Sequence, residues 1–122
     1  MKITVDAARE YFAHPSQQVM GITPETLPDG FDYRADGPVC LIFHPAMWPR
    51  VFGVHIAAKP EGRGRLVEPV GRVMREFWAE NDPLRVVSWV SEDNRAVIAL
   101  ARRCGAVIDG AFDGVVMLGW RL

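Results

Sequence analysis

Hydrophobic and polar residues along the chain follow two different periods, and these periods divide it into predicted strands and helices. Runs rich in β-branched and aromatic residues, either alternating with polar residues or continuously apolar, predict strands. Such runs cover residues 31–34, 39–43, 51–58, 84–90, 107–108 and 115–120. The run at 51–58 is apolar almost throughout, which is typical of a strand covered on both faces.

Two longer stretches have the spacing of an amphipathic helix. In residues 66–78 the apolar side chains recur every three or four positions, and Asn81-Asp82-Pro83 ends the pattern. A second helix is predicted after the cap-forming residues 91–94, ending at Gly105. Shorter helical segments are predicted at residues 6–13, which His14-Pro15 ends, and at 23–25, where a threonine precedes a proline.

The order of these elements predicts an α/β (α+β) fold. Residues 35–38 form a predicted turn that joins the first two strands into a hairpin, and strands and helices alternate after it. The expected architecture is a mixed central sheet with an antiparallel N-terminal hairpin and flanking helices. The chain has 122 residues, the size of one domain, so residues 1–122 are expected to form a single domain.

The composition indicates which partners and which cellular compartment to expect. The net charge is −1, so no global field favours nucleic acid or an anionic membrane, and we expect neither as a partner. No apolar segment reaches the roughly 20 residues of a bilayer span or resembles a signal peptide, which favours a cytoplasmic protein. Cys40 and Cys104 lie in apolar surroundings without metal-ligand spacing, so we expect core cysteines and no metal site.

The junction between the run at 51–58 and the first amphipathic helix has a composition suited to phosphate. It reads AAKPEGRGRLVEP, with glycines and arginines where the predicted strand meets the predicted helix. A helix N-terminus carries unpaired N–H groups and a partial positive charge, so a glycine-containing turn with cations at this place is a common phosphate site. The sequence therefore predicts a local anion site here.

This junction resembles that of the GNAT superfamily, the acetyl-CoA-dependent N-acetyltransferases. In that family a central strand leads into a turn of pattern V-x-P-x-x-R-G-x-G-x-G/A, whose backbone amides hold the pyrophosphate of coenzyme A. Ala58, Pro60, Arg63 and Gly64 fall in register with this pattern. The resemblance covers residues 39–120 and is that of a short, divergent member, of the size expected in phage-type genes.

A second family signature, N-x-x-A-x-x-x-Y-x-x-x-G-F, follows at the family's distance. Asn94 and Gly105 match its first residue and its late glycine. Ala101 stands where the family has the tyrosine that often protonates the leaving thiolate, and Ala106 replaces the phenylalanine. The resemblance therefore implies the fold more strongly than it implies the thiolate partner.

The resemblance implies acetyl-CoA as co-substrate, bound at this junction. The residues that it implies for cofactor binding are Ala58, Gly62, Arg63, Gly64, Arg65 and Asn94. For Asn94, contact with the pantetheine arm and simple capping of its helix both stay open. Leu66 and Glu68 stand where the family has glycine or alanine, so we expect their side chains to crowd and repel the phosphates and weaken the site.

Acetyl transfer to an amine requires a base, and His55 is the candidate by type and location. Its ordinary pKa suits base chemistry near neutrality. Strict alternation, however, places His55 on the face opposite Val54 and Ile56, so a bulge would be needed to bring it to the thioester; the alternative is a buried, hydrogen-bonded histidine. Ser91 is the candidate partner of the thiolate, with capping as its alternative. His44 is a further candidate base, or simply a strand end.

The four tryptophans have two expected roles. Trp78, Trp89 and Trp120 lie in periodic apolar segments and are expected in the core. Trp48 lies in a loop between predicted strands, where it is expected to be exposed.

Two functions from different classes follow from the sequence. The first is an acyltransferase that moves an acetyl group from acetyl-CoA to an unidentified small-molecule or peptide amine. The alternative is a catalytically inactive GNAT-fold binding or assembly module, phage-related in origin. Whether the chain is an enzyme stays open between them, and a homodimer is among the expected assemblies.

Overall fold

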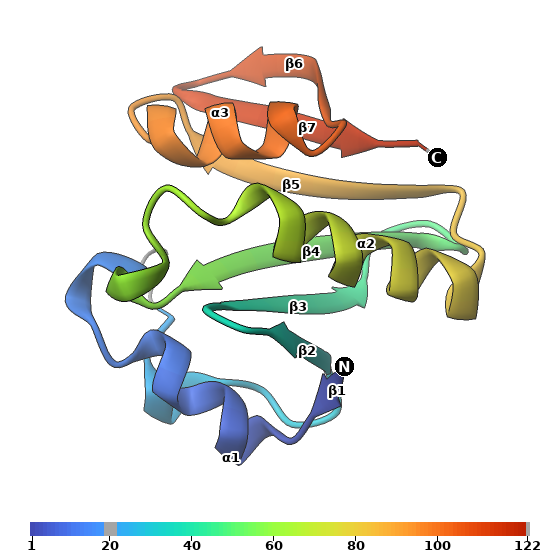
Figure 1. The fold of residues 1–122 in the computed structure, drawn as a ribbon. Helices are drawn as coiled ribbons and strands as arrows, with labels where there is room; N and C mark the ends of the chain where they lie inside the picture. The colour runs from blue at the N-terminus through green and yellow to red at the C-terminus, as the bar shows by residue number, and fades with distance from the viewer. Residues whose placement is uncertain (19–21, 122) are drawn as a thin grey trace.

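The computed structural model describes residues 1–18 and 22–121. Within these residues seven strands form one sheet in the order β1-β2-β3-β4-β5-β7-β6 (Figure 1). The strands are β1 (Lys2–Ile3), β2 (Asp32–Asp36), β3 (Val39–Pro45), β4 (Val51–Ala58), β5 (Arg85–Ser91), β6 (Val107–Phe112) and β7 (Val115–Trp120). The α-helices are α1 (Val5–Ala8), α2 (Val67–Asn81) and α3 (Arg95–Arg103), and short 3₁₀ helices cover Arg9–Phe12, Pro15–Gln17, Pro24–Thr26 and Pro60–Gly62.

The predicted architecture is confirmed. Strands β2 and β3 form the antiparallel hairpin, with Gly37 in the left-handed region at φ 56° in the turn. The chain then continues β4–α2–β5–α3–β6–β7, and β4 pairs with β5 in parallel. The sheet is therefore mixed, with helices against it, as the order of apolar patterns predicted.

The parallel pairing of β4 with β5 is short, and this creates the opening on which the site depends. Only Val51 to Gly53 of β4 pair with β5, opposite Arg85 to Val87. On its other edge β4 pairs with β3 as far as Ala58. The second half of β4 therefore has one edge that β5 does not cover, and Figure 1 shows the two strands diverging there.

Two apolar clusters cover the two faces of the sheet. The face toward α2 and α3 carries the larger cluster, which includes Phe43, Val54, Phe77, Leu118 and Trp120. The other face of β2, β3 and β4 packs against the N-terminal segment through a smaller cluster, which includes Ala8, Phe12, Tyr33, Cys40 and Ile42. Strand β4 is thus covered on both faces, as its continuous apolar character predicted.

The main helix follows from its apolar stripe. Val70, Val73, Met74 and Phe77 of α2 are buried, and Asp82 ends the helix in the left-handed region at φ 43°. The predicted N-terminal helix is shorter than expected, because α1 gives way to the 3₁₀ helix Arg9–Phe12. Strand β1 was not predicted, since two residues are too few to show a period of two.

A buried arginine fastens β2 to α2. Arg34 is 1% exposed, and its guanidinium donates to Asp32 at 2.9 Å, Glu76 at 3.1 Å and Glu80 at 2.7 Å. Burial lowers the pKa of Arg34, but the hydrogen bonds to Asp32 and Glu80 outweigh burial, so the pKa is raised. The charge is retained because three carboxylates replace the lost water.

One tryptophan prediction is wrong. Trp48 is 70% exposed as expected, but Trp89 is 42% exposed rather than in the core. Trp89 pairs with Met117 on the face opposite the larger cluster. The smaller cluster, which covers that face, draws its buried strand residues from β2, β3 and β4. Trp89 therefore lies beyond this cluster, although Val87 on the same face of β5 is buried.

The two cysteines are buried to different depths. Cys40 is buried, which raises the pKa of its thiol to about 12, and Cys104 is partly buried. In the described ranges, the helices are all too short or too polar for a membrane span.

Candidate functional site

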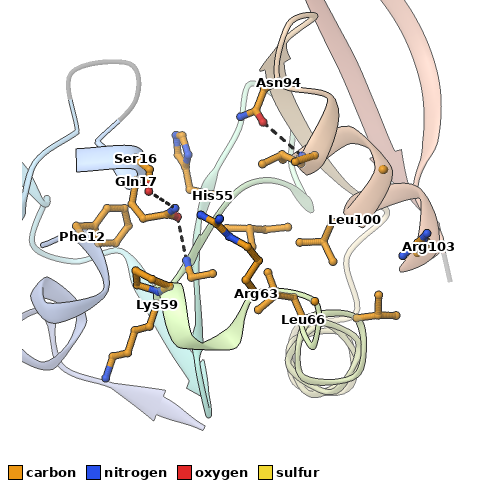
Figure 2. Close-up of a pocket in the computed structure, with 18 residues that line it drawn as sticks. Phe12, Ser16, Gln17, His55, Lys59, Arg63, Leu66, Asn94, Leu100 and Arg103 are labelled. Carbon is orange, nitrogen blue, oxygen red and sulfur yellow. Dashed lines mark hydrogen bonds between the residues drawn. The ribbon is translucent and has the colours of Figure 1, made fainter. Parts of the chain in front are cut away.

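A pocket of about 470 Å³ lies along the uncovered edge of β4 (Figure 2). Phe12, Ser16 and Gln17 line it from the N-terminal segment. On the other side it is lined by the turn after β4 and by the first residues of α2 and most of α3. The pocket has the volume of a small-molecule site and combines apolar walls with a few polar groups.

His55 lies in this pocket although β4 has no bulge there, so the prediction that a bulge is needed is wrong. Both His55 and Ile56 line it, although they point to opposite faces of β4. This is possible because β5 leaves the edge of β4 uncovered beyond Gly53, so the pocket reaches both faces. Burial lowers the pKa of His55, and the nearby His44 lowers it further, so the neutral imidazole is favoured.

The turn after β4 supplies an uncapped helix N-terminus. Gly64 adopts φ +84°, which favours glycine, and α2 begins at Val67. Leu66, the N-cap residue, makes no side-chain capping hydrogen bond. The first N–H groups of a helix have no intrahelical acceptor, so this end is suited to an anion.

Arg63 adds a cation to the same place. Its guanidinium makes no hydrogen bond or ion pair with any described residue, and Figure 2 shows the side chain extending from the turn into the pocket. Arg103, on the last turn of α3, also lines the pocket. Arginine forms paired hydrogen bonds with phosphate oxygens, so the pocket has the donors that a pyrophosphate requires.

Two of the residues expected to bind the cofactor do not line this pocket. Gly62 is buried against Pro38, and a Cβ added there would lie 2.3 Å from the Pro38 Cβ, so its role is close packing. Arg65 donates to the Glu61 carbonyl oxygen at 3.1 Å and lines a separate depression. Among the expected residues, Ala58, Arg63, Gly64 and Asn94 line the pocket.

Glu68 does not crowd the anion site, contrary to expectation, and the effect of its charge on anion binding stays a prediction. Its side chain is 90% exposed, lies 4.0 Å from the Arg72 guanidinium, and lines the separate depression rather than the pocket. The position of Glu68 on the helix therefore places its side chain outside the pocket. Leu66, in contrast, lines the pocket as expected and also packs against the larger cluster.

Asn94 and Ser91 behave differently. Asn94 lines the pocket, and its Oδ1 accepts from the Val97 N–H at 3.4 Å, so it caps α3 as well. Ser91 does not line the pocket; its Oγ accepts from the Asp93 N–H at 3.4 Å in the turn before α3. Ser91 does not cap α3 either, because Asn94 is the N-cap residue of that helix.

Sequence reasoning missed Gln17. The N–H of Ala58 donates to Gln17 Oε1 at 3.0 Å, and Gln17 Nε2 donates to Ser16 Oγ at 3.2 Å (Figure 2). Lys59 donates its N–H to Pro38 of the β3 side, so the N–H of Ala58 points the other way, into the pocket. Gln17 therefore takes a donor that a bound ligand would otherwise use.

No protein-family model matches the sequence, and no curated protein matches it either. Among solved structures, the chain is similar to an IAA acetyltransferase from Bacillus cereus, with a TM-score of 0.68 at 13% identity over 100% of this chain and 97% of that one. It is also similar to a chimera of the spermidine N-acetyltransferase SpeG from Vibrio cholerae and hSSAT, with a TM-score of 0.71 at 12% identity over 95% and 88%.

A third neighbour is a GNAT-family acetyltransferase from Bacillus anthracis, with a TM-score of 0.57 at 11% identity over 67% of this chain and 57% of that one. Against this protein, and against a SpeG mutant of which it covers 63%, the chain spans less than two thirds of the other's length. The chain therefore has the GNAT fold, as the resemblance implied. The phage-type origin is not addressed by these structures and stays a prediction.

Proposed function

We propose that the chain is an N-acyltransferase of the GNAT type, which binds acetyl-CoA in the pocket along β4 and transfers its acetyl group to a small-molecule amine. The observation that carries the proposal is that one pocket combines three features: an uncapped helix N-terminus, the uncovered edge of β4, and Arg63, which has no hydrogen-bond or ion-pair partner among the described residues. The similarity to amine acetyltransferases supports the reaction class, and a spermidine enzyme among them supports a small amine as acceptor.

Different parts of the pocket bind different parts of coenzyme A. Arg63 and the N–H groups at the start of α2 bind the pyrophosphate, because both offer donors to anionic oxygens. The edge of β4 binds the extended arm through its outward backbone groups, as one strand binds another. The apolar side chains from α2 and α3, including Leu66, Val97 and Leu100, exclude water from that arm.

His55 is the base of the proposed reaction. The amine nitrogen bonds to the acetyl carbon, the carbon–sulfur bond breaks toward sulfur, and the proton that the amine loses goes to His55. The lowered pKa of His55 keeps it neutral and able to accept that proton near pH 7. No described side chain of the pocket is a tyrosine or cysteine that would protonate the thiolate, so we assign that proton to solvent.

Two observations favour the second candidate, a binding module without catalysis. Leu66 lines the pocket where the family turn has glycine, so its side chain takes space beside the phosphates. Ala101 is fully buried in the core and offers no hydroxyl. Both differences count against catalysis, and the second candidate is a chain that binds a ligand in this pocket without transferring an acetyl group.

Calorimetric titration with coenzyme A tests the proposal. Arg63→Ala is expected to weaken binding by about 1.5 to 3 kcal/mol, the range for a hydrogen bond to a charged group. Arg65→Ala is the matched control, since Arg65 lies two residues away, bonds to Glu61 and does not line the pocket. Absence of binding at millimolar coenzyme A, or equal losses in the two variants, contradicts the proposed site.

A further inference from the structure

The face of the sheet toward the N-terminal segment holds a second histidine beside His55. In the pairing of β3 with β4, Ile42 lies opposite His55 and His44 lies opposite Gly53, so both histidines are on this face. Gly53 and His55 are two residues apart along β4, which is about 6.6 Å of strand. A ring placed over Gly53 is therefore a direct neighbour of the His55 side chain.

Gly53 makes that placement possible. A Cβ added at Gly53 would lie 2.4 Å from Cε1 and 2.5 Å from Nε2 of His44, closer than real Cβ contacts allow. The His44 ring therefore occupies the space where any other residue at position 53 would put its side chain. Phe31 stacks on this ring, with centroids 5.1 Å apart and 25° between the planes. The imidazole is held against the backbone of β4 in a defined orientation.

The hydrogen bonding of His44 fixes which of its nitrogens is free. Nδ1 lies 3.1 Å from the carbonyl oxygen of Pro45, at a solvent-exposed position. A carbonyl oxygen only accepts, so in the neutral ring Nδ1 carries the hydrogen and donates it. The lone pair is then on Nε2, the nitrogen that lies over Gly53. His44 thus presents a proton acceptor toward β4 and keeps access to solvent.

We propose that His44 is a second proton-carrying residue of this site, which receives through a water molecule the proton that His55 takes from the acceptor amine and releases it to solvent. The inference rests on the proposed function. The amine N–H bond breaks as the nitrogen bonds to the acetyl carbon, the carbon–sulfur electron pair leaves with sulfur, and the proton passes from His55 to His44. Because His44 acts through His55, it is a positioning residue rather than a catalytic one.

The other polar groups that line the pocket around His55 are uncharged or keep a constant charge near neutral pH. Burial and then His44 lower the pKa of His55. Ser16 and Gln17, which face the pocket from the 3₁₀ helix, are uncharged. The cations that line the pocket keep their charge throughout the range in which histidine titrates; they are Lys59, Arg63 and Arg103. His14, whose Nδ1 lies 2.7 Å from Ser16 Oγ, is the other imidazole close to the pocket. A dependence of the His55 titration that is lost in His44→Gln therefore reports His44 and not His14.

An NMR titration of both imidazoles in the full chain, between about pH 5 and 8, tests whether the rings are neighbours. His44→Gln removes the second titrating group, and Gly53→Ala displaces the His44 ring without removing it. Both variants are expected to raise the pKa of His55, with the larger rise in His44→Gln. Gly110→Ala is the matched glycine control, because a Cβ there meets open space, and it is expected to leave the His55 titration unchanged.

A kinetic measurement on the same variants tests the proton path. The probe is thiol release from acetyl-CoA with spermidine or the most rapidly acetylated amine of a panel. His44→Gln is expected to lower kcat by on the order of 10-fold, less than the 10²–10⁴-fold that a directly acting group contributes. The KM for acetyl-CoA is expected to stay unchanged, and added imidazole is expected to restore kcat, which a merely structural defect would not show.

The outcomes separate this inference from the proposed function. A raised His55 pKa together with a rescuable loss of kcat supports the pair. An unchanged His55 titration in His44→Gln overturns it, whatever the activity, and so does a shifted titration with unchanged kcat. If the wild-type chain acetylates no amine although the two rings titrate as neighbours, the proposed function fails, and the proton path fails with it.

Discussion

Replacing Gln17 by alanine is expected to make the protein less stable and the cofactor tighter bound. The side chain holds the N–H of Ala58 at 3.0 Å, across 41 residues of sequence, at the edge of β4 that faces the pocket. Coenzyme A carries amide carbonyls in its extended arm, and any of them that takes this N–H must first displace Gln17. Loss of the glutamine side chain removes that competition.

The size of both effects follows from one hydrogen bond. A neutral hydrogen bond contributes about 0.5 to 1.5 kcal/mol net, so Gln17→Ala is expected to lower the free energy of unfolding by about that amount. In the wild type, coenzyme A must break this hydrogen bond in order to bind, and in Gln17→Ala it need not. The free energy that is saved corresponds to a decrease in the Kd for coenzyme A of about 2- to 13-fold. Urea denaturation measures the first effect and calorimetric titration the second.

Gln18→Ala is the control for this experiment. Gln18 Nε2 donates to the carbonyl oxygens of Phe12 at 2.8 Å and Ala13 at 3.4 Å, and Gln18 does not line the pocket. The control is expected to lose stability without any gain in affinity. If coenzyme A binds Gln17→Ala no more tightly than the wild type while the fold is intact, the N–H of Ala58 has no part in binding.

Three further predictions concern stability. Arg34→Met leaves three carboxylates without the guanidinium that they share and is expected to lower the free energy of unfolding. Arg72→Met, which breaks an exposed pair, is expected to lower it much less, and urea denaturation of the two variants measures the difference. Gly71→Ala in α2 meets only the mobile end of Arg75 at 3.3 Å and is expected to raise the melting temperature, whereas Gly62→Ala, with its Cβ at 2.3 Å from Pro38, is expected to lower it. The pKa of His55 is lowered from 6.5 in the folded chain, so the unfolded chain binds the proton more readily. The free energy of unfolding of the wild type is therefore expected to fall relative to that of His55→Gln as the pH drops below about 6.5. Parallel curves of unfolding free energy against pH for the two proteins would refute the shift.

The elements of the fold could be predicted because each depends on a local pattern. The bounds of β4 match the apolar run at 51–58, and α2 follows the stripe of Val70, Val73 and Phe77. The order of the predicted elements and the resemblance in the turn then implied a mixed sheet with an antiparallel N-terminal hairpin, and the structure added the order of the strands in it. Two features were not predicted correctly. Strand β1 is too short to show a period of two, and the exposure of Trp89 depends on which part of the sheet the N-terminal segment covers.

The sequence predicted correctly only those site residues whose place in the chain alone brings them to the pocket. Arg63 and Gly64 line the pocket because they lie in the turn between β4 and α2. The orientation of Glu68 depends on the phase of the helix, and the access of His55 depends on where β5 leaves β4. Gln17 meets Ala58 only through tertiary packing across 41 residues. No local spacing contains that information, so these contacts had to come from the structure.

The most direct test of the proposed acyltransferase is the acetylation of an amine by the purified protein. Wild-type protein is incubated with acetyl-CoA and a panel of amines that includes spermidine, and the acetylated product is measured by mass spectrometry beside His55→Gln. We expect product with the wild type and a loss on the order of 10²- to 10⁴-fold in His55→Gln, with coenzyme A bound equally by both. Tight binding of coenzyme A without product from any amine would contradict it and would identify a binding module instead.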